Sequence, residues 1–159
     1  MILVFGGAFN GKLGFVKEEF EVSEEDIFYC NEDKINFSKK VICGLHKFTY
    51  FNVTKEKSSI EFIKNNIKLF KNKIIICDDI SSGIVPLKKE DRIWREETGK
   101  CLQYLSKESS KVYRVFCGIP SVIMIIKKTS IMRFSQAFLW ELVNRLNRTK
   151  SMDWEDQIL

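Results

Sequence analysis

The chain begins with a short apolar run that leads directly into a glycine-rich turn. "ILVF" (Ile2 to Phe5) is followed by "GGAFNGK" (Gly6 to Lys12). An apolar run of strand length, then glycines, then a helical pattern from Lys12 to Phe20 indicates a strand–turn–helix unit. Glycine suits such a turn because its backbone adopts positive φ and approaches a ligand closely. A strand, a glycine-rich turn and a helix in this order are the context that a phosphate-binding loop requires.

The turn matches most of a phosphate-binding loop, in which a strand is followed by Gly, four residues, Gly, Lys and then Ser or Thr. Gly6, Gly11 and Lys12 fit, but Leu13 stands where the Mg²⁺-binding hydroxyl is expected. The loop's N–H groups and the helix N-terminus attract phosphate oxygens, and the lysine reaches the β and γ phosphates. The pattern alone leaves two readings open, a nucleotide site and a tight turn with a solvated lysine. Leu13 weakens the case for metal-assisted transfer more than the case for phosphate binding.

The rest of the chain continues the alternation of strands and helices. Further strands are predicted at 27–30, 47–53, 73–77, 111–117 and 122–126, and further helices at 58–70, 87–105 and 131–148. The continuous apolar run "KIIIC" is typical of a parallel sheet. We therefore predict an α/β fold with a mostly parallel sheet flanked by helices. Residues 1–126 would form the α/β domain, and residues 127–159 a helical extension packed on it.

Composition excludes several classes of protein. With 159 residues, 45% of them hydrophobic and 30% charged, the chain is expected to form one globular domain. No apolar run approaches the roughly 18–20 residues of a membrane helix, and the N-terminal run is too short for a signal peptide, so we predict a cytoplasmic protein. Five scattered cysteines, without a CxxC pair, argue against a disulfide framework or a zinc site. We expect them to be small hydrophobes in a reduced core.

The net charge of +5 is unevenly distributed, because residues 127–150 are strongly basic. A basic segment of this kind contacts nucleic acid or an acidic partner in some proteins. A solvated helix face is the more common outcome, and we therefore do not expect nucleic acid as a partner.

Three separated segments resemble one family. "SGIVPLKKEDRIWREETGKCLQYL" (Ser82 to Leu105) resembles a segment of the bifunctional adenosylcobinamide kinase/adenosylcobinamide-phosphate guanylyltransferases, with a Gly-Ile-Val-Pro turn before a helix. The matching positions on that helix are Arg92, Trp94, Arg95, Glu96, Gly99 and Gln103. "KVYRVFCGIP" (Lys111 to Pro120) is similar to the family's closing strand, and "MILVFGGAFNGK" to its opening strand and loop. Their order along the chain makes the resemblance more specific than any one match.

The resemblance implies a fold, an activity and partners. The family has an α/β fold like that of the P-loop-containing nucleoside triphosphate hydrolases, and it typically assembles as a trimer. It phosphorylates adenosylcobinamide with a nucleoside triphosphate and then transfers GMP from GTP to that phosphate through a GMP–histidine intermediate. For this chain it therefore implies GTP or ATP with Mg²⁺, adenosylcobinamide or its phosphate as substrate, and a homo-oligomer.

Site residues follow from the matching positions. His46, the only histidine in the chain, is followed by Lys47 and resembles the family's guanylylated histidine. An imidazole nitrogen is a suitable nucleophile near pH 7, although a single histidine before a predicted strand is also compatible with no role. His46 and Lys12 are the predicted catalytic residues. The predicted nucleotide-binding residues are Gly6, Gly7, Ala8, Phe9, Asn10, Gly11, Lys12, Leu13 and Lys47.

The acids after "KIIIC" are the candidates for a metal ligand. Asp78 and Asp79 follow this predicted strand, and Asp79 is taken as the metal residue. A capping or turn role for the pair remains equally open.

The chain also departs from the family pattern. Leu13 lacks the hydroxyl, and Phe9 and Asn10 stand where the family has Arg and Ser. The segment between His46 and residue 73 is short for the strand that the family usually places there. A second hypothesis is therefore a degenerate, catalytically impaired nucleotide-binding or regulatory protein of the same fold.

Overall fold

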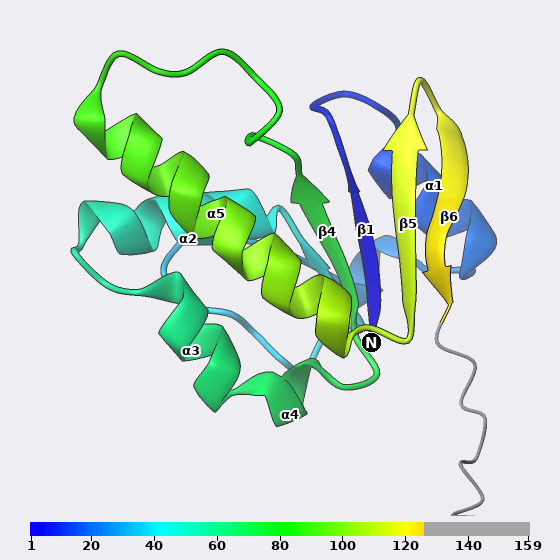
Figure 1. Ribbon diagram of the computed structural model, residues 1–159. Coiled ribbons are helices and arrows are strands. Elements are labelled where there is room, and N and C mark those ends of the chain that lie inside the picture. The colour runs from blue at the N-terminus through cyan, green and yellow to red at the C-terminus, as the bar shows by residue number, and fades with distance from the viewer. Residues whose placement is uncertain (126–159) are drawn as a thin grey trace, which may run out of the picture. The chain divides into compact units, whose positions relative to one another are not determined.

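A computed structural model describes residues 1–125, and its strands form one six-stranded sheet. The strands lie in the order β2-β3-β4-β1-β5-β6, and all neighbouring pairs are parallel except β5 with β6 (Figure 1). The predicted α/β fold with a mostly parallel sheet is confirmed. The strands are β1 Ile2–Gly6, β2 Ile27–Tyr29, β3 Val41–Cys43, β4 Ile74–Asp78, β5 Lys111–Phe116 and β6 Ile119–Ile125.

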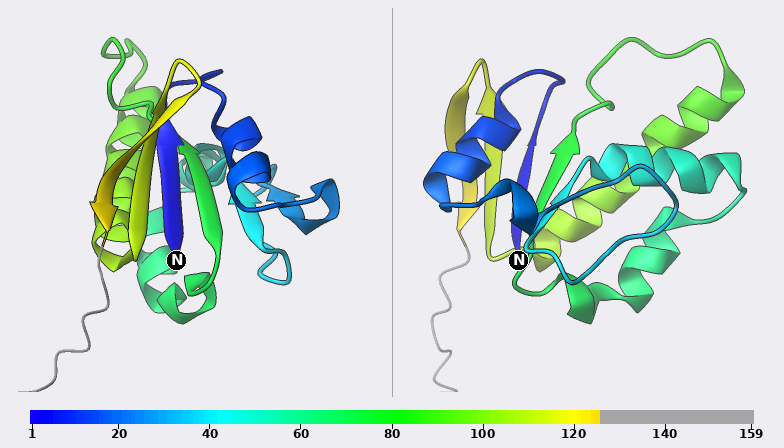
Figure 2. Two further views of the ribbon diagram at one scale, coloured as in Figure 1. Left: turned by 90° about the vertical axis from the view of Figure 1, so that its right-hand side faces the viewer. Right: turned by 180° about the vertical axis from the view of Figure 1, so that it is seen from behind.

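Helices cover both faces of the sheet. Figure 2 shows α1 on one face, whereas α2, α3 and α5 lie on the other. The connections between parallel strands carry these helices, as parallel pairing requires. The helices are α1 Lys12–Glu19, α2 Leu45–Thr54, α3 Ser59–Asn65, α4 Ile67–Phe70 and α5 Lys89–Glu108, with a short 3₁₀ turn at Glu24–Asp26.

Alternate residues of the strands supply two hydrophobic layers. Leu3 and Ile75 belong to the layer beneath α2 and α5, and Val4 and Ile76 belong to the layer beneath α1. This follows from the two-residue repeat of a strand, which sends successive side chains to opposite faces. Because both faces are covered, β1 and β4 read as continuous apolar runs, and their carboxyl ends meet at one edge of the sheet.

One part of the sequence prediction was wrong in a way that matters for the site. Residues 47–53 were expected to form a strand, but they lie in helix α2, and the strand of this region is β3, which the sequence prediction missed. The buried side chains of α2 are Leu45, Phe48, Thr49 and Asn52. They recur at helical spacing, so burial of one helix face outweighed the β-forming residue types.

Other differences are local. The helix predicted for 58–70 is divided at Asn66 into α3 and α4, and Ser58 caps α3 by accepting a hydrogen bond from Glu61 N–H (3.4 Å). Cys30, Cys77 and Cys101 are buried as expected, whereas Cys43 is half-buried and Cys117 is exposed.

The predicted helix at 131–148 and the predicted helical extension 127–159 lie outside the described residues. Within residues 1–125, no helix combines the length and the apolar character that crossing a membrane requires.

Candidate functional site

Backbone contacts from neighbouring elements hold the turn between β1 and α1. Gly6 O accepts a hydrogen bond from Asp79 N–H (2.8 Å), and Asn10 O accepts one from Gly118 N–H (3.2 Å). A Cβ added to Gly6 would lie 2.2 Å from Val115 O. This clash would involve backbone and could not be relieved by rotating a side chain, so the approach of β1 to β5 requires glycine here.

The end of the turn presents a strained residue beside a glycine cap. Gly11 is the N-cap of α1 with φ 80°, which glycine adopts readily. Phe9 has φ 59°, and its ring is fully exposed at the cavity described below. Positive φ in an aromatic residue is unfavourable and persists where the surrounding structure imposes it. The loop's shape is therefore set by its anchors rather than by the preferences of its own side chains.

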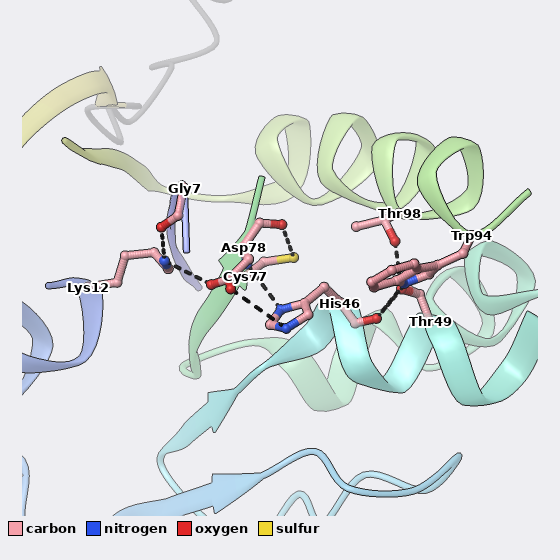
Figure 3. A network of polar contacts seen from close by, with 8 residues as sticks. All are labelled: Gly7, Lys12, His46, Thr49, Cys77, Asp78, Trp94 and Thr98. Atoms are coloured by element: carbon pink, nitrogen blue, oxygen red, sulfur yellow. Dashed lines mark hydrogen bonds and ion pairs between the residues drawn. The ribbon is translucent and has the colours of Figure 1, made fainter. Parts of the chain in front are cut away.

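Lys12 is buried with its ammonium group paired. Only 5% of the residue is exposed, and Nζ donates to Gly7 O (2.6 Å) and lies 2.8 Å from Asp78 Oδ1 (Figure 3). A buried ammonium group is tolerated only where such partners replace water. Because Asp78 is in register with Gly6 on the adjacent strand, the β1–β4 pairing brings the lysine and the carboxylate together.

His46 lies in the first turn of α2, on the opposite side of Asp78. Its Nδ1 accepts a hydrogen bond from Asp78 N–H (3.2 Å), and its Nε2 lies 3.7 Å from Asp78 Oδ2 (Figure 3). Burial lowers the pKa of His46 below its ordinary value of 6.5; Lys47 and Lys12 act in the same direction, and Asp78 opposes them. The imidazole is therefore neutral at pH 7, and the proton lies on Nε2 because Nδ1 is an acceptor.

A layer of polar side chains supports the backbone of His46. Its carbonyl oxygen accepts hydrogen bonds from Trp94 Nε1 (2.7 Å) and Thr49 Oγ1 (2.7 Å). Thr49 in turn shares a buried hydrogen bond with Thr98 (2.6 Å), so α5 fixes the start of α2 (Figure 3). Thr49 and Thr98 were not predicted from the sequence as supporting residues. The signal for Thr98 was the spacing of four from Trp94, which places both on one face of a helix.

A cavity of about 390 Å³ lies between the loop and α2, a size that suits a small ligand. Lys12, His46 and Asp78 all face it. Of the predicted nucleotide-binding residues, those that line it are Phe9, Asn10, Gly11, Lys12, Leu13 and Lys47. Gly6, Gly7 and Ala8 do not line it; Gly7 contributes through its carbonyl contact with Lys12.

The structure separates the two acids that follow β4. The Asp79 carboxylate accepts hydrogen bonds from the hydroxyl groups of Ser81 (2.6 Å) and Ser82 (2.5 Å). Burial acts to raise the pKa of Asp79, but these hydrogen bonds outweigh it and lower the pKa. A metal role for Asp79 stays a prediction, and Asp78, which the sequence analysis did not select, is the acid that lines the cavity. Its signal was its position at the end of the strand that pairs with β1.

Other potential nucleophiles in the cavity are held in their protonated forms. Burial raises the pKa of the Cys30 thiol to about 12 and that of the Cys43 thiol to about 11. A hydrogen bond to Glu24 (2.5 Å) raises the pKa of Tyr29 to about 12. Thiols and phenols are nucleophilic as anions, so these groups are inert at pH 7. Among the described residues, the cavity thus offers one neutral nitrogen nucleophile, His46.

A comparison with family models covers the part of this site that contains His46 and Asp78. The model described as cobinamide kinase / cobinamide phosphate guanyltransferase matches residues 43–123, which is more than half of the 159 residues. The chain belongs to this family. The resemblance seen in the sequence is thereby confirmed, and with it the P-loop-like α/β fold. The matched segment includes His46 and Asp78, whereas the loop of residues 6–12 lies before it.

Membership in the cobinamide kinase/guanyltransferase family gives the chain a general role in cobalamin biosynthesis. The family uses nucleoside triphosphates and acts on cobinamide and its phosphate. No curated protein matches this chain.

Proposed function

We propose that the cavity binds the triphosphate of GTP and transfers its guanylyl group to His46, from which cobinamide phosphate accepts it. The observation that carries this proposal is Asp78, which contacts Lys12 on one side and His46 on the other within one cavity. A phosphate-binding lysine and a nucleophile must act on one ligand in a guanylyltransferase, and this arrangement brings them to it.

The loop supports the phosphate half of the proposal. Its backbone is held open by Gly6 and Gly11 and leads into the N-terminus of α1, where N–H groups favour an anion. Lys12 Nζ is bound by a carbonyl and a carboxylate, both of which a phosphate oxygen can replace as partners. Leu13 adds no ligand, but the N–H groups do not depend on its side chain.

The histidine half is supported by the state of the imidazole. We infer that Nδ1, the ring nitrogen with the free lone pair, attacks the α-phosphorus and gives up its hydrogen bond from Asp78 N–H. The Nδ1–P bond forms, the bond from the α-phosphorus to the bridging oxygen breaks, and pyrophosphate leaves. As the ring becomes positively charged, the proton of Nε2 passes to Asp78 Oδ2, 3.7 Å away before the ligand binds. Asp78 then acts as a general base of a kind that contributes about 10²–10⁴-fold to a rate.

Mg²⁺ is the metal that the family resemblance implies. The described residues contain no group of three or more His, Cys, Asp or Glu side chains suited to holding a metal ion. A nucleotide-bound Mg²⁺ needs only one or two carboxylates beside the phosphate oxygens. Asp78, through the oxygen that faces Lys12, fits as a single protein ligand. When bound, Mg²⁺ would withdraw charge from the phosphate oxygens and improve the leaving group.

Labelled GTP tests the transfer. The purified chain is incubated with GTP labelled at the α-phosphorus, and acid-labile label on the protein is counted. We expect label on the unchanged chain and none on His46→Ala or His46→Gln, because the chain has no other histidine. GTP labelled at the γ-phosphorus serves as the control: it should leave the protein unlabelled and, if the kinase step operates, label cobinamide. Equal α-label on the His46 variants would overturn the proposal.

A second candidate is a family member that binds nucleotide without turnover. It is favoured by Leu13, whose apolar side chain lines the cavity where a hydroxyl would ligate Mg²⁺. Calorimetric binding of GTP without any protein label would support this candidate. The predicted trimer is a separate proposal, and analytical ultracentrifugation of the full chain tests it.

A further inference from the structure

A second cavity, of about 510 Å³, is lined by residues of α5 and of the loop that joins β4 to this helix. Its polar lining comes from Ser81, Arg92, Arg95, Glu96, Lys100 and Gln103. None of these residues lines the cavity that contains Lys12 and His46. The two cavities therefore present separate sets of groups to a ligand.

The two arginines of this second cavity lack acidic partners. Arg92 Nη1 donates to the carbonyl groups of Leu87 (2.7 Å) and Pro86 (3.2 Å), and Arg95 Nη2 donates to the carbonyl of Ser81. Arg95 Nη1 is buried and has no hydrogen-bond partner among residues 1–125. In the same part of the chain neither guanidinium forms an ion pair with a carboxylate. A buried guanidinium nitrogen without a partner is costly, so this donor is available to a ligand acceptor.

The charge in the cavity is positive. Arg92, Arg95 and Lys100 face it with one carboxylate, Glu96, which is bound to Lys100 (2.7 Å). That exposed pair on one helix face is weak, but it offsets the negative charge of Glu96. Two guanidinium charges remain to be balanced. Arginine forks match the oxygen atoms of a phosphate group in pairs, which favours phosphate over a point-like anion.

A glycine on α5 provides space for the ligand. Gly99 lies between Arg95 and Gln103 along the same face of the helix and lines the cavity. A Cβ added there would meet no atom within 4 Å, so no close approach within the described chain requires glycine. Glycine disfavours a helix interior, and at this point it leaves the helix backbone open to the cavity.

We propose that this arginine cavity binds the phosphate group of an organic phosphate monoester. The exposed side chains of Ile84 and Leu87 on the adjoining loop offer apolar contacts to the rest of such a molecule. A phosphate monoester is also the kind of molecule that the guanylyltransferase reaction consumes, so its cobinamide phosphate would be the natural ligand; this assignment rests on the proposed function. The binding of a phosphate group by the two arginines does not depend on the proposed function.

Calorimetry with phenyl phosphate, a dianion with an apolar body, tests the site on the full chain. We expect phenyl phosphate to bind with a Kd of about 1 mM or tighter. Its affinity should weaken about tenfold in Arg95→Gln and in Arg92→Gln, because each substitution removes a charged hydrogen-bond donor. Arg114→Gln, an exposed arginine on β5, is the matched control and should bind normally. Circular dichroism establishes that each variant is folded. If Arg95→Gln does not fold, Arg92→Gln, whose residue is exposed, decides the question.

Competition separates this site from the nucleotide cavity. Phenyl phosphate should bind equally well to the chain saturated with GTP and to Lys12→Met. Four results would overturn the proposal. Phenyl phosphate could fail to bind to the unchanged chain, fail to bind to Lys12→Met, or be displaced by GTP. It could also bind with equal affinity to Arg92→Gln, Arg95→Gln and Arg114→Gln. Failure of His46 labelling would contradict the proposed function and leave this result unaffected.

Discussion

The cavity around Asp78 has two halves that are built differently. The loop half consists mainly of backbone, whose shape is set by contacts of Gly6 and Asn10 with other elements. The histidine half depends on individual side chains, since Trp94 and Thr49 hold the carbonyl of His46. A backbone site tolerates changes of side chain, whereas a side-chain network does not. Phosphate binding should therefore survive the replacements seen in this loop, while transfer should be sensitive to single substitutions.

The largest effect is expected where the two halves meet. Asp78→Asn keeps the backbone N–H on His46 but removes the proton acceptor, so the rate of His46 labelling should fall about 10²–10⁴-fold. Single-turnover labelling at saturating GTP measures it. Asp79→Asn is the matched control, because its carboxylate lies on Ser81 and Ser82 instead. If the labelling rate fell further in Asp79→Asn than in Asp78→Asn, Asp79 and not Asp78 would be the acid that acts on His46.

The next effect separates binding from transfer. Lys12→Met removes a charged donor to phosphate, and GTP affinity should weaken about 10–100-fold, corresponding to 1.5–3 kcal/mol for a charged hydrogen bond. Calorimetry measures the affinity. Lys17→Met, on the same helix but paired with Glu24, should leave affinity unchanged. Equal affinities of the two variants would show that the loop half does not bind phosphate through Lys12.

A smaller effect is expected in the layer behind His46. Trp94→Phe removes the donor to the His46 carbonyl, worth about 0.5–1.5 kcal/mol, so the labelling rate should fall about two- to tenfold. GTP affinity should be unchanged, because Trp94 positions the nucleophile and lies outside the cavity. A loss of affinity without a change in rate would mean that this layer supports the loop half instead.

The smallest effect is a gain. Leu13→Ser restores a hydroxyl at the position where a phosphate-binding loop ligates Mg²⁺. Half-saturation by Mg²⁺ in the labelling reaction should then occur at a concentration a few-fold lower, on the order of 1 kcal/mol of added binding. Leu13→Ala controls for the lost apolar volume. The same improvement in both variants would mean that space rather than the hydroxyl limits metal binding.

The sequence predicted the loop half better than the histidine half for a physical reason. The strand, glycines and Lys12 form a local unit whose pattern lies within twelve residues. Helix α1 follows this unit directly, so the helix and its lysine were placed correctly, although contacts with distant residues set the shape of the loop. The matched GIVP turn and the arginine spacing on α5 are local in the same way.

The histidine half could not be predicted as well because it is assembled from distant segments. Aromatic and β-branched residues between Lys47 and Val53 favour a strand, and only burial against α5 shows why α2 forms. The choice between Asp78 and Asp79 depends on the register of β4 with β1. A shift of one residue would reverse which of the two side chains faces the cavity, and a strand that is apolar on both faces does not reveal its register by alternation.

The proposed transfer depends on the protonation state of the His46 imidazole. Because this is the only histidine, its ring nitrogens can be followed without ambiguity by two-bond ¹H–¹⁵N NMR as a function of pH. A neutral ring with the proton on Nε2 and a pKa below 6.5 are expected, since burial disfavours the charged form. A lowered pKa in the folded chain also means that stability gained above pH 6.5 is lost as the pH falls below that value. A pKa at or above 6.5, or a proton on Nδ1, would contradict the assignment of His46 as the neutral nucleophile.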